Sequence, residues 1–568
     1  MAGLVPGFQT ARSYERSWLG PDAVAGFVLV GLLAPAGMAY ATAAGLPPVT
    51  GLYATIVPML LYAVFGPSRI FVIAPDSSLA PLIAAAVIPI AGGDADSAIA
   101  LGSVMALITG GMCILAGLAR FGFVAELLSA PVRYGYLHGI ALTIIIGQTA
   151  KLCGFSVSGE TVILQIDDFV DQLRADAFNG WALAVGLGCL AVLLVLRAID
   201  RRIPGPLIVV VLGIVATVVL GLDDKGVALV GELPQGFPQF GLPDVDRDSW
   251  RTLIGASAGV ALVAFADTSV LSRTMGLRRH EHVDQNHELI ALGIANAGAG
   301  LAQGFPVSAS SSRTPVAESM GARTQLTGVV AAGVLIALIA VAPGVFRNLP
   351  DPALAAIVIA AAISLIDIPA MVRLWRVRRS EFVLSLAAFL SVALFGPVNG
   401  VVLAVVLSLL NFIRRAWKPH TAELVRVDGL KGYHDRERHP EGRVVPGLML
   451  YRFDAPLFFA NARFFTEDLE DRLDERADPV DCVIITAEPI TDIDTTAADA
   501  IKELVSDLEH RGIELRFAEL KGTVHERLDQ YHSFDGLAAP DHTARTTGEA
   551  VRDYLHDYGV EWTDWEDQ

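Results

Sequence analysis

Two stretches of the chain interrupt long apolar runs with proline and serine, and they carry the residues best suited to binding an anion. They are Phe65–Ala80, FGPSRIFVIAPDSSLA, and Gly304–Gly328, GFPVSASSSRTPVAESMGARTQLTG. A helix that begins inside a membrane exposes unpaired backbone N–H groups and the positive end of its dipole. Interrupted segments in two halves of a chain indicate a midplane site, so two helix starts that face each other predict a pocket for a small anion.

Arg313 is the cation of the second stretch. It directly follows Ser310, Ser311 and Ser312, and its side chain could add a charge-assisted hydrogen bond to an anion. Pro315 suits the first turn of a helix that starts here. The alternative is that the serines are ordinary caps and that Arg313 is the partner of a carbonyl or an acid. The local sequence favours neither.

Two carboxylates lie near these stretches. Asp267 stands inside the apolar run ALVAFADTSV, where an acid is costly and usually functional, so it could bind a proton or a sodium ion. The alternative is a structural pairing with Arg273 or Arg313. Asp76 stands at the first helix start, where a carboxylate is a good cap but would repel an anion that it faced. The sequence does not show which way Asp76 points.

The elements that must position these residues are membrane-spanning helices. Of the 568 residues, 53% are apolar and 18% are charged, and several apolar runs approach the ~20 residues that cross a bilayer as a helix. Others are too short or interrupted. The runs expected as membrane segments are Asp22–Ala44, Gly51–Phe65, Ser77–Ala91, Ser97–Ala119, Tyr134–Leu152, Trp181–Leu196, Leu207–Leu222, Leu253–Leu271, Leu289–Ala302, Pro315–Met320, Leu326–Val341, Ala353–Ile366, Phe382–Phe395 and Val398–Ile413.

Loop charges predict the topology. Basic residues near helix ends mark the cytoplasmic side. They cluster at Arg197–Arg202, Arg278–His280, Arg373–Arg379 and Arg414–Lys418. Acidic loops, at Asp94–Asp96, Glu160–Asp176 and Asp223–Asp248, are expected on the opposite side. The alternation predicts an even number of spans with both termini in the cytoplasm, and no signal peptide is recognised before Trp18.

The negative charge of the chain is concentrated at its end. The formal net charge is −18, and from Thr421 onward 16 Lys and Arg stand against 34 Asp and Glu, which accounts for the whole excess. Such a balance argues against nucleic acid as a partner and favours a soluble domain. The four cysteines, Cys113, Cys153, Cys189 and Cys482, stand far apart without a metal-binding pattern, so we expect no metal and no cofactor.

After Pro419 the pattern changes to short strands and amphipathic helices. Leu448–Phe453, Cys482–Thr486 and Ile513–Ala518 are expected as strands. Ala460–Glu475 and Thr495–Glu509 have helical spacing. The order strand, helix, strand, helix, strand predicts a small α/β domain.

Three motifs of the membrane part resemble the sulfate permease (SulP) family of anion transporters. They are GLLAPAGMAYATAAGLPPVTGLYA at Gly31–Ala54, DQNHEL at Asp284–Leu289 and GARTQLTG at Gly321–Gly328. Beyond Pro419, YRFDAPLFFANARF at Tyr451–Phe464 and ITDIDTTA at Ile490–Ala497 are similar to a STAS domain. The likeness covers almost the whole chain.

This resemblance implies fourteen membrane segments in two inverted seven-segment repeats, split into a core and a gate domain that move as an elevator. It implies a cytoplasmic N-terminal segment at residues 1–20, a transport domain at 21–418 and a cytoplasmic STAS domain with an acidic tail at 419–568. A homodimer in the cell membrane is also implied. Thr495 matches the position that is phosphorylated in anti-sigma-factor antagonists.

The resemblance also implies which residues bind the anion and the coupling ion. Asp267 matches the carboxylate that serves as the proton or sodium site. Two departures from the family pattern are Ala36, where many members have Gln, and Asp76, where many have a small or neutral residue. The expected anion-binding residues are Ala36, Tyr40, Asp76, Ser77, Ser78, Ser310, Ser311, Ser312 and Arg313.

The function predicted from these features is transport without covalent chemistry, namely the uptake of an inorganic anion, with sulfate and a proton as the first choice. Bicarbonate, chloride or dicarboxylate transport, coupled to protons or sodium or by exchange, is the alternative within the same class. From other classes, an anion channel or a membrane sensor that signals through the STAS domain remains open. Asp267 argues against the channel, which would not need a coupling acid.

Overall fold

The fold was taken from a computed structural model of the chain. It describes residues 6–123, 129–157, 161–200, 203–231, 237–279, 281, 283–310, 313–531 and 543–567. The chain forms two compact units, residues 1–408 and 409–568, and the division falls inside one long helix. The domain boundary expected at residue 418 comes directly after that helix ends at Trp417.

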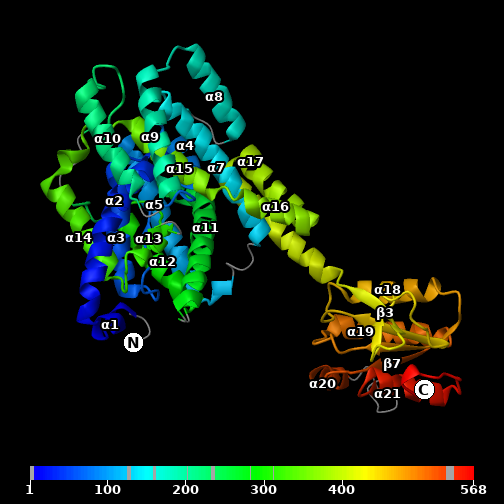
Figure 1. The fold of residues 1–568 in the computed structure, drawn as a ribbon. Coiled ribbons are helices and arrows are strands. Elements are labelled where there is room, and N and C mark those ends of the chain that lie inside the picture. Colours follow the sequence, from blue (N-terminus) through cyan, green and yellow to red (C-terminus); the bar gives the residue numbers. More distant parts are fainter. Residues whose placement is uncertain are drawn as a thin grey trace. The chain divides into compact units, whose positions relative to one another are not determined.

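The first unit is almost entirely helical (Figure 1). Among the described residues, seven helices are long and apolar enough to cross a membrane, and α4, α10 and α14 are shorter apolar helices. A count of fourteen spans stays a prediction. The helices are α1 (Pro6–Arg12), α2 (Leu19–Ala43), α3 (Pro48–Phe65), α4 (Ala80–Ala91), α5 (Ala95–Leu118), α7 (Ala130–Leu152), α8 (Val162–Arg174), α9 (Gly180–Ile199), α10 (Gly205–Leu220), α11 (Arg247–Arg279), α12 (Gln285–Leu301), α13 (Arg313–Ser319), α14 (Leu326–Val341), α15 (Asp351–Leu365), α16 (Ile368–Val377) and α17 (Arg379–Trp417).

These helices pack in two groups. In one, α2, α3, α5, α11, α12 and α14 contact one another, and in the other, α7, α9, α10 and α15 do so. Small residues allow close approach inside the first group: a Cβ on Gly293 of α12 would lie 2.7 Å from the Gly110 carbonyl oxygen of α5. Helices inside a membrane gain their packing energy from such close contacts, because lipid removes the usual hydrophobic drive between them.

The two last expected spans, Phe382–Phe395 and Val398–Ile413, are two helical segments of α17 that a kink at Gly396 separates. Gly396 has a φ of 83°, which glycine adopts without steric cost, and Pro397 follows it. A Cβ on Gly400 would lie 2.4 Å from the Val392 Cα, so the two halves approach closely at the break.

One expectation about the loops was wrong. The acidic stretch Glu160–Asp176 was expected as a loop, but its described part contains the helix α8. Thr161 caps this helix by accepting a hydrogen bond from the Leu164 backbone N–H. Charged residues spaced among Ile163, Leu164 and Leu173 make it amphipathic, which the charge count alone does not show.

The second unit is the predicted α/β domain. Its described strands lie in the order β4-β3-β5-β6-β7-β8, and β5 to β8 are parallel. Apolar side chains of α18, α19 and α20 pack with β5, β6 and β7 in one core, and α21 packs with the sheet in a second core. The elements are β3 (Thr421–Arg426), β4 (Tyr433–Asp435), β5 (Gly447–Phe453), α18 (Ala462–Asp474), β6 (Val480–Thr486), α19 (Thr495–His510), β7 (Glu514–Ala518), α20 (Gly522–Gln530), β8 (Thr543–Ala544) and α21 (Thr547–Asp557).

The candidate anion site

The two interrupted stretches meet in the buried interior of the helical unit, at a point called the crossing here. Two short strands, β1 (Ile73–Ala74) and β2 (Ser308–Ala309), pair antiparallel, with Ile73 opposite Ala309 and Ala74 opposite Ser308. Helix α4 begins a few residues after β1, and α13 begins a few residues after β2. The pairing therefore brings Asp76 and Arg313 together, although 237 positions separate them in the chain.

Backbone groups in these extended segments need partners, because no water reaches them in a membrane interior. The Ser310 N–H donates to the Val72 carbonyl at 3.0 Å, and the Val72 N–H donates to Thr314 Oγ1 at 3.1 Å. The Ala309 N–H donates to Thr268 Oγ1 at 3.2 Å. Asn296 both donates to and accepts from the Val307 backbone. These bonds hold the crossing in one register.

Arg313 lies at the start of α13 and is 5% exposed. Its Nε donates to Ser310 Oγ at 2.8 Å, and its Nη2 donates to the Pro75 carbonyl oxygen. Its guanidinium carbon lies 5.7 Å from the ring centre of Tyr40, within the range of a cation–π contact. The side chain is thus fixed from both interrupted stretches and from α2.

Two donors beside this crossing have no hydrogen-bond partner among the described residues: Arg313 Nη1 and Ser308 Oγ, and Ser308 is fully buried. Buried polar atoms are almost always hydrogen-bonded, so an orphaned one calls for a ligand or a water. The donor set, a guanidinium and a hydroxyl, suits an anion. Ser308 was not among the residues predicted from the sequence.

Asp76 has two roles here. Its Oδ1 accepts the Ser78 backbone N–H at 3.2 Å, which holds the turn that precedes α4. Its Oδ2 lies 3.5 Å from Arg313 Nη2, with the side chain 15% exposed. Asp76 therefore faces the site, where it is the counter-ion of Arg313.

Asp267, on α11, also reaches the start of α4. Its Oδ2 accepts a hydrogen bond from Ser78 Oγ at 2.9 Å. The suggested pairing of Asp267 with Arg313 is not the contact that forms, because Arg313 pairs with Asp76. Ser78 is 1% exposed, so this bond lies in the interior.

The remaining predicted site residues are Ala36, Tyr40, Ser77, Ser310, Ser311 and Ser312. Ala36 and Tyr40 are buried one helical turn apart on α2, and Ser77 is buried before α4. Ser310 is fully buried and bonded to Arg313. Ser311 and Ser312 lie outside the described residues. Helix α13 has only seven residues, so Arg313 itself is its main contribution.

The described side chains bring a guanidinium and hydroxyl groups together, which are donors that an anion can accept from. The parts described contain no group of three or more His, Cys, Asp or Glu that could hold a metal ion. What the site presents is one fixed guanidinium, hydroxyl groups and the start of a twelve-residue helix beside two carboxylates.

Comparison with known proteins decides the family. The model of the sulfate permease family matches residues 19–388, and the STAS domain model matches residues 439–550. This chain belongs to the sulfate permease family. A probable sulfate transporter of Mycobacterium tuberculosis is 40% identical to this permease over 97% of this chain and 98% of its own length. The chloroplastic sulfate transporter 4.1 of Arabidopsis thaliana is 31% identical, over 92% of this chain and 78% of its own length.

Solved structures show the same fold. The murine Slc26a9 anion transporter in its inward-facing state matches with a TM-score of 0.88, at 22% identity, over 97% of this permease and 94% of that chain. The transmembrane domain of a cyanobacterium bicarbonate transporter, BicA, matches with a TM-score of 0.60 at 22% identity. The match covers 70% of this chain and 98% of that domain. This permease is thus a multi-pass membrane protein of the family of transporters, with a C-terminal α/β STAS domain.

Two family motifs of this permease hold helices together rather than touch the site. Glu288 of DQNHEL is fully buried, and its carboxylate accepts hydrogen bonds from the Tyr62 hydroxyl and, at 3.0 Å, from Ser68 Oγ. Gln325 of GARTQLTG donates to the Ser68 carbonyl at 2.9 Å. The two motifs therefore meet at the segment that follows α3.

Asp22 is a further buried acid that the sequence analysis did not single out. It accepts backbone N–H bonds from Arg323 and Thr324, at 2.6 and 3.1 Å, and hydroxyl bonds from Thr324 and Thr327. Asp22 thereby joins the start of α2 to the start of α14. An acid at the edge of an apolar run is the signal that could have identified both Asp22 and Glu288.

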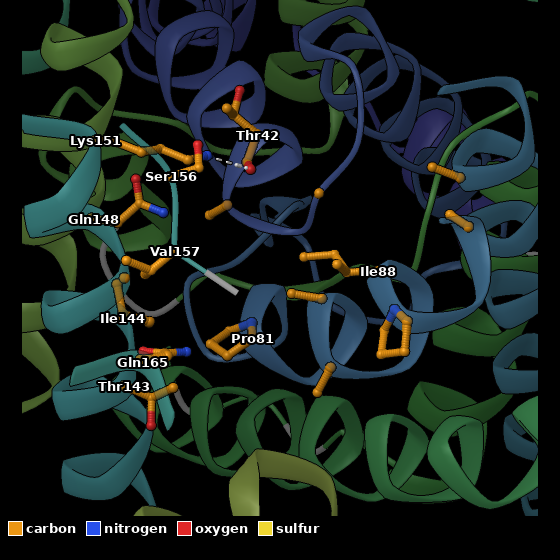
Figure 2. Close-up of a pocket in the computed structure, with 18 of the residues that line it drawn as sticks. Thr42, Pro81, Ile88, Thr143, Ile144, Gln148, Lys151, Ser156, Val157 and Gln165 are labelled. Atoms are coloured by element: carbon orange, nitrogen blue, oxygen red, sulfur yellow. Dashed lines mark hydrogen bonds between the residues drawn. The ribbon is translucent and has the colours of Figure 1, made fainter. Parts of the chain in front are cut away.

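A cavity of about 610 Å³ lies between α2 and α4 on one side and α7 and α8 on the other, next to Asp94 (Figure 2). Its walls include Thr42 of α2, Pro81 and Ile88 of α4, and Gln148 and Lys151 of α7. Lys151 Nζ donates to the Thr42 carbonyl at 2.9 Å, a bond that joins the two groups (Figure 2).

The cavity approaches the site without including it. Its described lining contains none of the predicted anion-binding residues, but Pro81 follows Ser78 by one turn and Thr42 follows Tyr40. The cavity thus ends at the first turn of α4, next to the site.

Proposed function

We propose that this chain is a secondary active transporter that carries sulfate together with a proton. The observation that carries the proposal is the buried Nη1 of Arg313, which has no partner among the described residues and lies on a guanidinium held beside the start of α4. A sulfate ion has four oxygens that accept hydrogen bonds. It could accept from Nη1, from the Ser308 hydroxyl and from the residues at the start of α4.

The choice of sulfate rests on the relatives, several of which are named as sulfate transporters at up to 40% identity over nearly the whole chain. The anion-binding residues proposed for this function are Ala36, Tyr40, Asp76, Ser77, Ser78, Ser310, Ser311, Ser312 and Arg313. Ser308 is added to them because its hydroxyl is buried beside the crossing and unpaired within the described part of the chain.

Asp267 is the proposed proton site. An acid inside a span is tolerated when protonation neutralises it during transit. Asp267 accepts a hydrogen bond from Ser78 at the start of α4. The proposed proton site and the proposed anion site therefore have Ser78 in common. An anion nearby disfavours the ionised carboxylate, which makes proton binding and anion binding mutually supportive.

The packing supports movement of one helix group against the other. The site residues lie on α2, on α11 and at the starts of α4 and α13, all in or attached to the first group, whereas the cavity is bounded on its other side by α7 and α8. Sliding of the first group would carry the site across the membrane as an elevator. The bond between Lys151 and Thr42 would break in that movement.

The topology, assembly and regulation of the chain are part of this proposal. Both termini and the STAS domain face the cytoplasm, the chain forms a homodimer, and Thr495 is a site for regulatory phosphorylation. Thr495 is exposed at the first position of α19, directly after the capping residue Asp494. A phosphate there would lie at the positive end of the helix dipole.

The test is uptake of labelled sulfate by the purified full chain in liposomes, at equal pH and with an inward proton gradient, with sodium absent. We expect the gradient to drive accumulation. Asp267→Asn mimics the neutral acid and should keep sulfate exchange while losing the gradient-driven accumulation. Binding without flux would indicate a sensor, and competition by chloride or bicarbonate in place of sulfate would assign another anion. Accumulation that survives in Asp267→Asn would exclude this residue as the coupling site.

A further inference from the structure

Two carboxylates that are far apart in the chain converge on one hydroxyl group. Ser78 Oγ lies 3.2 Å from Asp76 Oδ1 and 2.9 Å from Asp267 Oδ2. A serine hydroxyl has a single hydrogen to donate and two lone pairs that accept. It can satisfy only one of the two carboxylates. The other contact becomes favourable when that carboxyl group carries a proton of its own and donates it to Ser78 Oγ.

Asp76 is at the same time bound to the cation of the anion site. Its Oδ2 lies 3.5 Å from Arg313 Nη2, and the two side chains are 15% and 5% exposed. An ion pair that is so little hydrated is costly to break unless another charge replaces the lost partner. A bound anion is such a replacement, so Asp76 and the anion compete for Arg313.

Two arginines and two tyrosines lie near the two acids and must be considered as charged or titratable neighbours. Arg313 on α13 pairs with Asp76, and Arg133 on α7 is a second cation near the cluster. Tyr40 on α2 and Tyr136 on α7 are phenols in the neighbourhood of Asp76 and Asp267 respectively. Phenols titrate near pH 10, far above neutral pH. Among the groups named here, the two carboxyl groups are the ones that contact Ser78 Oγ, so a proton can pass between them and this hydroxyl.

We propose that Asp76 and Asp267 form one proton-binding site around Ser78, and that Asp76 is an internal counter-ion which the transported anion replaces when a proton is taken up. The inference rests on the proposed function and extends it, because there the proton belongs to Asp267 alone. In the empty site Asp267 carries one proton and donates it to Ser78 Oγ, while the hydrogen of Ser78 goes to the ionised Asp76, which pairs with Arg313.

On anion binding, a second proton from water bonds to a carboxylate oxygen of the pair. The ion contact between Asp76 Oδ2 and Arg313 breaks, and hydrogen bonds from Arg313 to the anion form. No covalent bond to the anion and no electron transfer takes part. When the anion leaves, the carboxyl group releases its proton and the contact with Arg313 re-forms. One proton thus accompanies each anion.

The proposal predicts a proton count that calorimetry can measure. Sulfate is titrated into the purified full chain at one pH in buffers of different ionisation enthalpy, which yields the protons taken up per sulfate bound. The parent should take up about one proton at the pH where the pair is half titrated, as linkage requires. Asp76→Asn keeps an oxygen that can cap the Ser78 N–H but has no charge for Arg313. It should take up almost no proton and should bind sulfate roughly tenfold more tightly than the parent at pH 8.

Ser78 provides the matched pair of variants. Ser78→Thr keeps the hydroxyl that joins the two acids and should keep the proton count of the parent. Ser78→Ala removes the hydroxyl and should shift the pH dependence of proton uptake, because the two acids no longer share a proton. If Ser78→Thr does not fold, the comparison of Asp76→Asn with the parent still decides.

The proton count distinguishes a wrong assignment of Asp76 from a wrong assignment of proton coupling. If the parent takes up protons with sulfate and Asp76→Asn takes up the same number, the shared site is refuted and proton-coupled transport stands. If the parent takes up no proton with sulfate at any pH at which it binds, the proposed coupling itself is wrong, and the shared site falls with it. Weaker sulfate binding by Asp76→Asn at every pH would show that Asp76 supports the anion instead of competing with it.

Discussion

Replacing Arg313 with alanine separates the anion-binding role of this residue from its structural one. The guanidinium uses Nε on Ser310, uses Nη2 on the Pro75 carbonyl and Asp76, and leaves Nη1 for the anion. Arg313→Ala therefore removes one proposed contact with sulfate and also leaves the little-exposed Asp76 without its cation.

The magnitudes of the two effects differ. A hydrogen bond from a charged donor contributes about 1 to 3 kcal/mol, so sulfate binding should weaken roughly 5- to 150-fold. Loss of one partner from a buried ion pair costs about 3 to 5 kcal/mol of folding stability, and the 15% exposure of Asp76 places the cost at or below the low end. The double variant Arg313→Ala with Asp76→Asn removes the unpaired charge. It should recover most of the stability but not the affinity.

The assay is sulfate binding by titration calorimetry on the purified chain, with the melting temperature measured in parallel. Arg313→Lys should recover only part of the affinity, because one ammonium cannot replace a planar fork that contacts Ser310, Pro75 and the anion together. A folded Arg313→Ala variant that binds sulfate as tightly as the parent would refute the reasoning. The residue would then be structural, and the site would rest on the start of α4.

Three further predictions concern topology, the soluble domain and its tail. A cysteine introduced at Asp94 should react with an impermeant thiol reagent from outside, and one at Arg376 should not; labelling of both from the same side would overturn the topology. Truncation after Lys418 should leave sulfate affinity largely intact in a titration, because the site lies in the first unit, and loss of binding by a well-folded truncation would place part of the site elsewhere. In the tail, burial alone would raise the pKa of Asp564, but hydrogen bonds from Arg426 outweigh it and lower that pKa. The contact should therefore stabilise the tail above about pH 4 and be lost as the pH falls through the lowered pKa. Hydrogen exchange at residues 562–567 should rise below that pH, and exchange that is constant down to pH 2.5 would show that the ion pair does not hold the tail.

The sequence located the two interrupted stretches but not how they are arranged in space. Proline and serine within apolar runs identified both interrupted stretches, because helices must break there whatever surrounds them. The orientation of Asp76 could not be predicted, since it depends on the register of β1 against β2, a pairing between distant segments. Ser308 was missed for the same reason. A serine in an apolar run is common, and only the crossing shows that its hydroxyl lacks a partner among the described residues.

In the fold, too, local spacing predicted elements but not the contacts between distant segments. In the STAS domain, strands β5, β6 and β7 and helices α18 and α19 lie within three residues of the predicted bounds, because their apolar spacing is local information. The antiparallel strands β3 and β4 and the helix α21 were not predicted. Membrane segments were recognised by length and apolar content, but the buried bonds of Asp22 and Glu288 reach partners more than two hundred residues away.

The central claim is that the anion binds where the two interrupted stretches cross. The most direct test locates selenate, an analogue of sulfate whose selenium gives an anomalous signal, in crystals of the full chain. The account predicts a selenium peak within hydrogen-bond reach of Arg313 Nη1 and Ser308 Oγ, beside the start of α4. A single peak in the cavity at Lys151, with none at Arg313, would contradict it.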